Sequence, residues 1–261
     1  MKKLTILFLA FLISATSYVL ADDMRFVQVD NLLYSSKNES SKIMFSKMID
    51  DINKQKNIEF IVFSGNNIAK ASAENLGSFL KDAKKLKKPY YIILGNKDVN
   101  KSKNMSKQSY MQLVSKKNRS HKKIMSANYT FTKKGLVFIV VDGSKDVIPT
   151  SMGYYKAETL DWLEEQLNKY SDKKIIILQH FPLVPPSKRE SHYTYKADEY
   201  LELLNNHNNI LAVISGHFGV DKETELNNIL HISTSGTPTY KIIDILNYDS
   251  EKPMFWSINK Q

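Results

Sequence analysis

The chain of 261 residues contains no cysteine, only nine glycines and only two tryptophans. Without thiols the protein has no disulfides, no thiolate metal ligands and no cysteine nucleophile. The sequence also lacks a P-loop, a dinucleotide-binding fingerprint, a Gly-x-Ser-x-Gly elbow and a His-Glu-x-x-His helix, so those enzyme classes have no support. What is present is 42% hydrophobic residues, the content of a globular chain with one large core rather than a disordered tail.

The first residues have the pattern of an export signal. Two lysines precede the apolar run Leu4–Ile13, and small residues lead up to a cleavage position after Ala21. We therefore predict a signal peptide at residues 1–21, a mature domain at 22–261, and export to the periplasm or the cell exterior. The other interpretation is an uncleaved anchor, because Leu4–Leu20 has 17 residues, the lower limit for crossing a bilayer. Once the signal is removed, no membrane span is expected.

The formal charge of +10 is concentrated in two places. Two charges belong to the predicted signal peptide, and the segment Lys97–Lys123 holds nine bases and one acid, Asp98. The mature protein is thus a neutral body with one basic segment, either a solvated loop or helix face or an electrostatic collar that concentrates anions near a crevice. Tyr110 is the only aromatic residue of the segment, too little for a base-stacking platform, so no nucleic-acid module is predicted.

Strands alternate with helices along the chain. Apolar runs of strand length occur at Phe26–Val29, Ile58–Phe63, Tyr90–Leu94, Leu136–Val141, Lys174–Leu178, Ile210–Ile214 and Ile229–Ile232. Helical periodicity occurs at Ser41–Asn53, Ala73–Leu86, Ala157–Tyr170 and Asp198–Asn206. This alternation predicts an α/β fold whose largely parallel sheet is covered on its faces, followed by consecutive strands at the C-terminal end.

Polar residues follow five of these strands directly. They form the segments Val29–Leu33, Ser64–Asn67, Leu94–Asp98, Leu178–Pro182 and Ser215–Gly219. Ligands of open α/β sheets bind beyond the carboxyl ends of the strands, so these segments predict one shared crevice.

The five segments resemble, in order, the five motifs of the calcineurin-like metallophosphoesterase superfamily: D-x-H, G-D, G-N-H-[DE], H-x-P and G-H-x-H. The resemblance covers nearly the whole mature chain. It implies a single-domain, four-layer α-β-β-α sandwich with two facing sheets, and a two-metal site that hydrolyses phosphate esters.

The chain departs from these motifs at five positions. Asn31 and Leu33 stand where the first motif has Asp and His, Asn66 replaces the bridging carboxylate, Lys97 replaces a histidine, and Gly219 replaces the last histidine. The motif positions that are kept are Asn96, His180, Pro182 and His217.

The resemblance sorts these residues into two unequal metal sites. The first would consist of Asn31, Leu33, Asn66 and Gly219, without an imidazole or a charge, and the second of Asn66, Asn96, His180 and His217. Two divalent cations about 3.5–4 Å apart repel each other and need anionic oxygens, which an asparagine does not supply. We therefore predict no dinuclear centre, and either no cofactor or at most one divalent ion such as Zn²⁺ at the second set.

Other roles for the same residues stay open. His180 and His217 are metal ligands, anion-binding groups or core histidines, and Lys97 is an exposed loop lysine or a fixed cation in place of metal charge. An anionic, phosphate-containing ligand would be bound by Lys97, Asn96, His180 and His217. The remaining histidines lie outside the motifs and are expected to be surface or structural residues: His121, His192, His207 and His231.

Two functions are compatible with this pattern. The first is an exported pseudo-phosphoesterase that keeps an anion- or partner-binding crevice, in which no residue has an assigned catalytic role. The second is a weak phosphoester hydrolase that uses a single metal at the surviving half-site.

Overall fold

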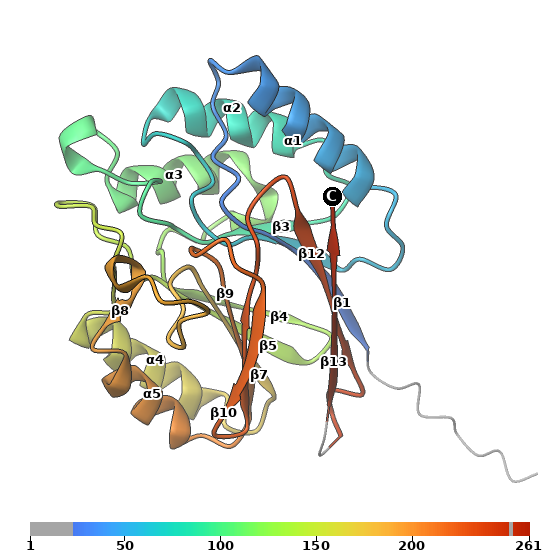
Figure 1. Cartoon of the computed structure of the whole chain (residues 1–261), viewed down its shortest axis with the longest axis vertical. Coiled ribbons are helices and arrows are strands. Elements are labelled where there is room, and N and C mark those ends of the chain that lie inside the picture. The colour runs from blue at the N-terminus through green and yellow to red at the C-terminus, as the bar shows by residue number, and fades with distance from the viewer. Residues whose placement is uncertain (1–22, 251–252) are drawn as a thin grey trace, which may run out of the picture.

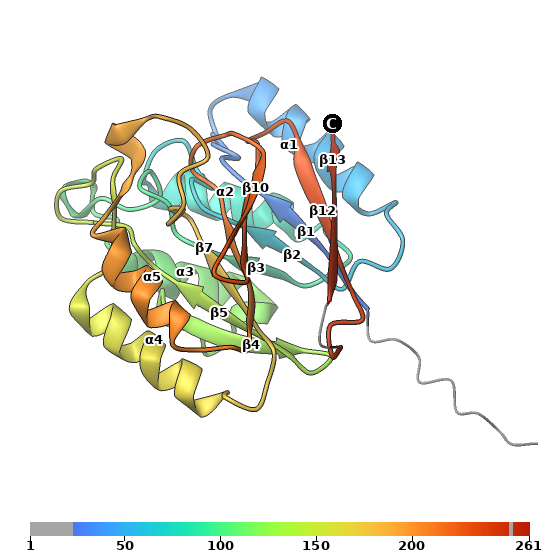
Figure 2. The same cartoon turned by 60° about the horizontal axis from the view of Figure 1, so that its bottom comes forward.

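A computed structural model describes residues 23–250 and 253–261; the predicted signal peptide lies outside them. In this part of the chain two sheets face each other (Figure 1). Helices α1 (Glu39–Ile52), α2 (Ala73–Ala83) and α3 (Lys107–Lys117) lie outside the first sheet, and α4 (Ala157–Lys169) and α5 (Ala197–Asn205) outside the second. Figure 2 shows α4 and α5 side by side on the second sheet. The four-layer sandwich expected from the sequence is therefore present.

The first sheet has the order β13-β12-β1-β2-β3. Its strands are β13 (Met254–Lys260), β12 (Tyr240–Leu246), β1 (Met24–Val29), β2 (Phe60–Phe63) and β3 (Tyr90–Ile92). Strands β1, β2 and β3 are parallel, whereas β12 and β13 run antiparallel to their neighbours.

The second sheet has the order β10-β11-β9-β7-β5-β4. Its strands are β10 (Lys222–Leu226), β11 (Ile229–Ser233), β9 (Ile210–Ser215), β7 (Ile175–Gln179), β5 (Leu136–Val141) and β4 (Tyr129–Lys133). The four strands β5, β7, β9 and β11 are parallel. A separate two-stranded ribbon joins β6 (Gly153–Tyr154) to β8 (Thr194–Tyr195).

The core between the sheets is aromatic. Phe26 on β1 stacks on Phe60 of β2 with ring centroids 4.8 Å apart, and Phe138 of β5 meets Phe60 edge-on at 5.0 Å. All three rings are fully buried, and burial stabilises the fold by about 1.5–3 kcal/mol for each. These contacts fix the two sheets against each other and thereby bring their strand ends together.

The three helices on the first sheet begin at side-chain caps. Asn38, Ser72 and Ser106 each accept a hydrogen bond from the backbone N–H three residues later, which contributes about 1 kcal/mol per helix. Helix α3 and the short 3₁₀ turns η1 (Lys101–Lys103) and η2 (Arg119–His121) occupy the basic segment. No helix among the described residues is long and apolar enough to span a bilayer.

Candidate functional site

The carboxyl ends of the parallel strands meet at one crevice, as the sequence predicted. Its cavity volume is about 470 Å³, and four of the five strand-end segments supply residues to its wall; the segment Leu178–Pro182 does not. The lining residues are Asn31, Asn66, Asn96, Lys97, Ser151, His192, His217, Phe218, Gly219, Ser235, Gly236 and Thr237. Among these described residues none is a carboxylate, and Lys97 carries the one permanent charge.

The floor of the crevice is built from backbone in the left-handed region. Asn31, Leu33 and Asn66 have φ of 48°, 51° and 53°. The N–H of Leu33 donates to the carbonyl of Asn66 at 2.9 Å, which ties the first segment to the second. For leucine this conformation costs about 1–2 kcal/mol, so the surrounding hydrogen bonds impose it on the residue.

Two amides and a lysine occupy the centre of this floor. Nδ2 of Asn66 donates to Oδ1 of Asn31 at 2.8 Å, and Oδ1 of Asn66 accepts from the backbone N–H of Lys97 at 2.9 Å. Both ends of the Asn66 amide are therefore engaged within the protein. The side chain of Lys97 is exposed at the crevice.

His180 and His217 form a buried pair behind this floor. Nδ1 of His180 lies 2.7 Å from the carbonyl oxygen of Ser64, and Nε2 of His217 lies 2.7 Å from that of Ser151. Because carbonyls only accept, these two nitrogens carry the hydrogens. The other two nitrogens, Nε2 of His180 and Nδ1 of His217, face each other at 3.1 Å.

Burial keeps both rings neutral. It lowers the pKa of His180 to about 4 and that of His217 to about 2, the latter reinforced by repulsion from His180. In the neutral rings the two facing nitrogens present lone pairs toward one point. Two nitrogens about 2.0–2.1 Å from a zinc ion can lie at this spacing, so the pair fits two ligands of one cation.

Asp30 is the carboxylate nearest to this pair; it is fully buried and does not line the crevice. Its side chain accepts hydrogen bonds from Nδ2 of Asn31 at 2.6 Å and from the backbone N–H of His217 at 3.0 Å. Burial raises the pKa of Asp30 well above its usual value, although these bonds oppose the shift. Oδ1 of Asp30 lies 3.7 Å from Nδ1 of His180. Because the pKa of the carboxyl is raised and the imidazole ring is neutral, this contact is not a strong ion pair.

Asp98 is likewise directed inward. It accepts from the backbone N–H groups of Ile68 and Gly95 and from Nδ2 of Asn67. Burial raises its pKa to about 7. Asp98 thus holds the second and third strand-end segments together.

The described residues do not fit two metal ions, because no carboxylate lines the crevice and both polar atoms of the Asn66 amide already have hydrogen-bond partners. They contain no cluster of three or more His, Cys, Asp or Glu side chains suited to a metal. They do fit one ion held by neutral donors. Besides the facing nitrogens of His180 and His217, Oδ1 of Asn96 is buried without a hydrogen-bond partner.

His192 is a crevice residue that the sequence did not reveal. It lies on η3 (Glu190–His192) and stacks on His217, with ring centroids 4.7 Å apart. Its position depends on a loop between β7 and α5 that carries no motif. His121 and His231 are buried away from the crevice and His207 is half-buried, which agrees with structural or surface roles.

The basic segment does not form a continuous collar. Of its nine bases, Lys97 is the one that lines the crevice in the described part of the chain. Lys116, Lys117 and Arg119 instead line a separate groove with Lys84, Lys87 and Lys88.

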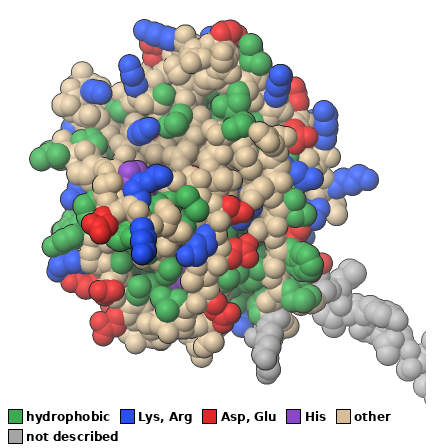
Figure 3. All heavy atoms as spheres, viewed as in Figure 1, with side chains coloured by type: hydrophobic (Ala, Val, Ile, Leu, Met, Phe, Trp, Pro, Cys, Tyr) green, Lys and Arg blue, Asp and Glu red, His purple; other side chains and the backbone are tan. Residues whose placement is uncertain are grey.

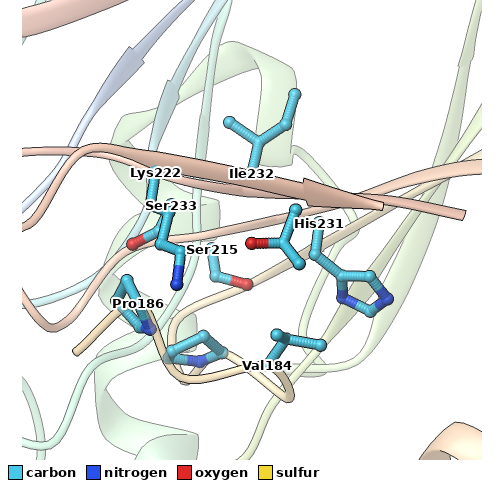
Figure 4. A pocket seen from close by; sticks show the side chains of 9 residues that line it. Val184, Pro186, Ser215, Lys222, His231, Ile232 and Ser233 are labelled. Atoms are coloured by element: carbon cyan, nitrogen blue, oxygen red, sulfur yellow. The ribbon is translucent and has the colours of Figure 1, made fainter. Parts of the chain in front are cut away.

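A small pocket beside the crevice lies between the loop after β7 and strands β10 and β11 (Figure 4). Val184, Pro186, Ser215, His231 and Ser233 surround it. Its cavity volume of about 10 Å³ has room for one water molecule. It is therefore no alternative to the crevice as a ligand site.

Comparison with known proteins supports the resemblance. The sequence profile "Calcineurin-like phosphoesterase" matches residues 40–221, which include the second to fifth strand-end segments but not Asn31 or Leu33. A curated relative, "Probable glycerophosphodiester phosphodiesterase GpdQ" of Arcobacter nitrofigilis, is 23% identical over 219 residues, or 83% of this chain and 76% of the relative.

Solved structures share the fold at low identity. A dimetal phosphatase from Danio rerio has a TM-score of 0.68 and 14% identity, covering 91% of this chain and 99% of its own. GAP50, "the anchor in the inner membrane complex of Plasmodium", has a TM-score of 0.61 and 17% identity, covering 92% and 89%. With its strand-end motifs in order and a profile match over most of its length, the chain belongs to the calcineurin-like phosphoesterase family.

Proposed function

We propose that the crevice binds a phosphate-containing or other anionic ligand and that the chain is a pseudo-phosphoesterase. The observation that carries the proposal is Asn66, an amide bonded on both sides at the position of the family's metal-bridging carboxylate. A site built for two cations needs negative charge, and the described lining offers only Lys97. An ammonium holds phosphate as a point charge, so the same lining suits an anion.

Loss of hydrolysis follows from the same residues. A two-metal phosphoesterase generates its nucleophile on the metals and stabilises the attacking and leaving oxygens between them. Asn31 and Asn66 are neutral, and Lys97 stands where the motif places an imidazole. One structural neighbour, GAP50, is named as an anchor, which agrees with a non-hydrolytic use of this fold.

Ligand binding is tested by thermal unfolding with inorganic phosphate and with a nucleoside monophosphate. Wild type should gain several degrees in Tm at millimolar ligand, because a ligand bound to the native state shifts unfolding. Lys97→Met should lose most of the gain, whereas Lys87→Met, in the separate basic groove, should keep it. No shift in wild type, or an equal loss in both variants, contradicts the proposal.

The alternative is a weak hydrolase with a single metal. It is supported by the facing nitrogens of His180 and His217 and by the unpartnered Oδ1 of Asn96. A cation held there would polarise a phosphoryl oxygen. Turnover of generic phosphomonoesters or diesters that chelators abolish would establish this alternative. In that case Asn66→Asp combined with Lys97→His should raise activity above the wild-type baseline.

Export is a separate proposal that rests on the predicted signal peptide at residues 1–21. Fractionation of cells that express the full chain should find the protein outside the cytoplasm, shortened at its N-terminus. Intact protein in the cytoplasmic fraction would contradict it.

A further inference from the structure

Exposed hydrophobic side chains gather at one rim of the crevice. Ten large hydrophobic residues of the described chain are exposed, and four of them belong to the loop between β5 and β6 or to the β6–β8 ribbon. Val147 and Ile148, at the tip of the loop, are 64% and 73% exposed. Met152 and Tyr195 are the other two. In Figure 1 this loop projects, in yellow-green, at the left of the molecule.

Lysines are fixed directly beside this tip. Asp146, next to the loop tip, accepts two backbone hydrogen bonds. Its carbonyl accepts from the N–H of Lys101, on η1, at 2.6 Å, and its carboxylate accepts from the N–H of Lys107 at 3.0 Å. The exposed side chains of Lys101 and Lys103 therefore lie on a turn that is tied to the loop. In Figure 3 hydrophobic side chains at the left edge lie near several lysine or arginine side chains.

The same loop forms part of the crevice wall. Ser151 lines the crevice, and its carbonyl oxygen is the partner of Nε2 of His217. Lys97 lines the same crevice and lies four residues before Lys101 in the sequence. A surface that met the loop tip and η1 would thus lie across the opening of the crevice.

We propose that this rim, defined as residues 144–154, Tyr195 and η1, docks onto an anionic lipid bilayer. The side chains of Val147 and Ile148 would enter the membrane–water interface, while the adjacent lysines attract acidic headgroups. Each lysine near the membrane surface contributes about a fivefold gain in binding. The tyrosines suit the headgroup level, because their rings are amphipathic. Docking by the rim is independent of what the crevice binds.

A bilayer fits these residues better than a folded partner does. A specific protein interface buries about 800 Å² on each side, whereas the rim offers four exposed hydrophobic side chains and the lysines of η1. Shallow insertion into lipid needs only such a tip with charge beside it. If the crevice binds an anion as proposed above, that anion would be a phosphate in the bilayer, such as a lipid headgroup.

The test is sedimentation of the protein with vesicles of phosphatidylcholine alone or with phosphatidylglycerol added. Wild type should bind the acidic vesicles at least tenfold more tightly, and salt should weaken the binding. The double variant Val147→Ser/Ile148→Ser should lose about tenfold. Lys101→Ala/Lys103→Ala should lose about 25-fold, since each lysine contributes about fivefold.

Two control variants test whether binding depends on where these residues lie rather than on the kind of residue removed. Trp256→Ser/Ile258→Ser removes apolar residues that are 61% and 47% exposed on the edge strand β13. Lys87→Ala/Lys88→Ala removes the same charge from the other basic groove. Both should bind acidic vesicles as wild type does. Equal losses in rim and control variants, or no preference for acidic vesicles, would overturn the proposal.

A separate measurement distinguishes failure of the proposed function from failure of membrane docking. Phosphate-dependent Tm shifts, measured without vesicles, report on the crevice, and they should be unchanged in the Val147→Ser/Ile148→Ser variant. Vesicle binding without a phosphate shift would support the rim and reject the crevice ligand. A phosphate-dependent Tm shift without vesicle binding would support the crevice ligand and reject docking by the rim.

Discussion

Nδ2 of Asn66 donates a hydrogen bond to Oδ1 of Asn31 across 2.8 Å, so two neutral side chains meet where the family motifs place two carboxylates. Changing both to Asp would set two anions at this distance. Like charges about 4 Å apart near a protein surface cost on the order of 4 kcal/mol. We expect Asn31→Asp/Asn66→Asp to lower Tm by several degrees in chelator and to regain it with Mn²⁺ or Zn²⁺.

The control for this pair is another amide pair on the surface. Asn227 donates to Asn205 at 2.9 Å in an exposed setting, so Asn205→Asp/Asn227→Asp should cost little and respond little to metal. Equal behaviour of the two double variants would show that the crevice has no special affinity for cations even when carboxylates are restored.

Metal titration tests the histidine pair directly. The spacing of His180 and His217 allows one ion, so calorimetry with Zn²⁺ should give a stoichiometry no higher than one. If heat is released, His217→Ala should remove it, whereas His192→Ala should leave it, because the His192 ring only stacks on His217. Two equivalents per chain would contradict the single-site geometry.

Gly216 is a steric requirement of the site. A Cβ at this residue would lie 1.9 Å from Oδ1 of Asp30, a fully buried atom. We expect Gly216→Ala to destabilise the protein by about 3 kcal/mol or more in urea unfolding, since overpacking here displaces a buried hydrogen-bonded group.

The contrasting glycine lies inside α2. A Cβ at Gly77 would meet nothing closer than Nζ of Lys117 at 3.6 Å. Gly77→Ala should therefore stabilise the protein by about 0.5–1 kcal/mol. A similar effect of both substitutions would mean that Asp30 moves freely, contrary to its hydrogen bonding.

Acid should destabilise the protein through its buried histidines. Burial lowers the pKa of His121 to about 3, below its value in the unfolded chain, and its Nε2 accepts from the backbone N–H of Ile92. The unfolded state thus binds more protons, and the free energy of unfolding falls as pH drops from about 6.5 toward 3. Each such histidine contributes about 1.4 kcal/mol per pH unit.

Substitution of His121 measures that contribution. His121→Gln keeps an acceptor for Ile92 and should reduce the slope of unfolding free energy against pH by about one proton. An unchanged slope in His121→Gln would place the acid sensitivity elsewhere.

Much of the fold was predictable because buried parallel strands are continuous apolar runs. The runs at Leu136–Val141 and Ile210–Ile214 correspond to β5 and β9 within one residue. Helix α3 was not predicted, because it buries only Tyr110, Met111 and Val114 while the rest of its surface is polar. Strand β10 was missed for a similar reason, since it has no buried residue.

The residues of the site were predictable from the sequence, but many of their contacts were not. Local sequence placed Asn31, Asn66, Lys97, His180 and His217 after strands, and the structure brings them together as expected. What the sequence could not indicate is contact between distant segments. The stacking of His192 on His217, the inward turn of Asp30 and the carbonyl of Ser151 all depend on loops whose paths are set by tertiary packing.

Leu33 keeps a left-handed backbone although its side chain has nothing to coordinate. Two backbone hydrogen bonds to the second segment hold this conformation. The N–H of Leu33 donates to the carbonyl of Asn66, and the N–H of Tyr34 donates to the carbonyl of Asn67. Main-chain hydrogen bonds therefore hold the left-handed backbone here, whichever side chain stands at residue 33. Substitutions that change only the side chains of Asn31, Leu33 and Asn66 should therefore leave this main-chain framework in place.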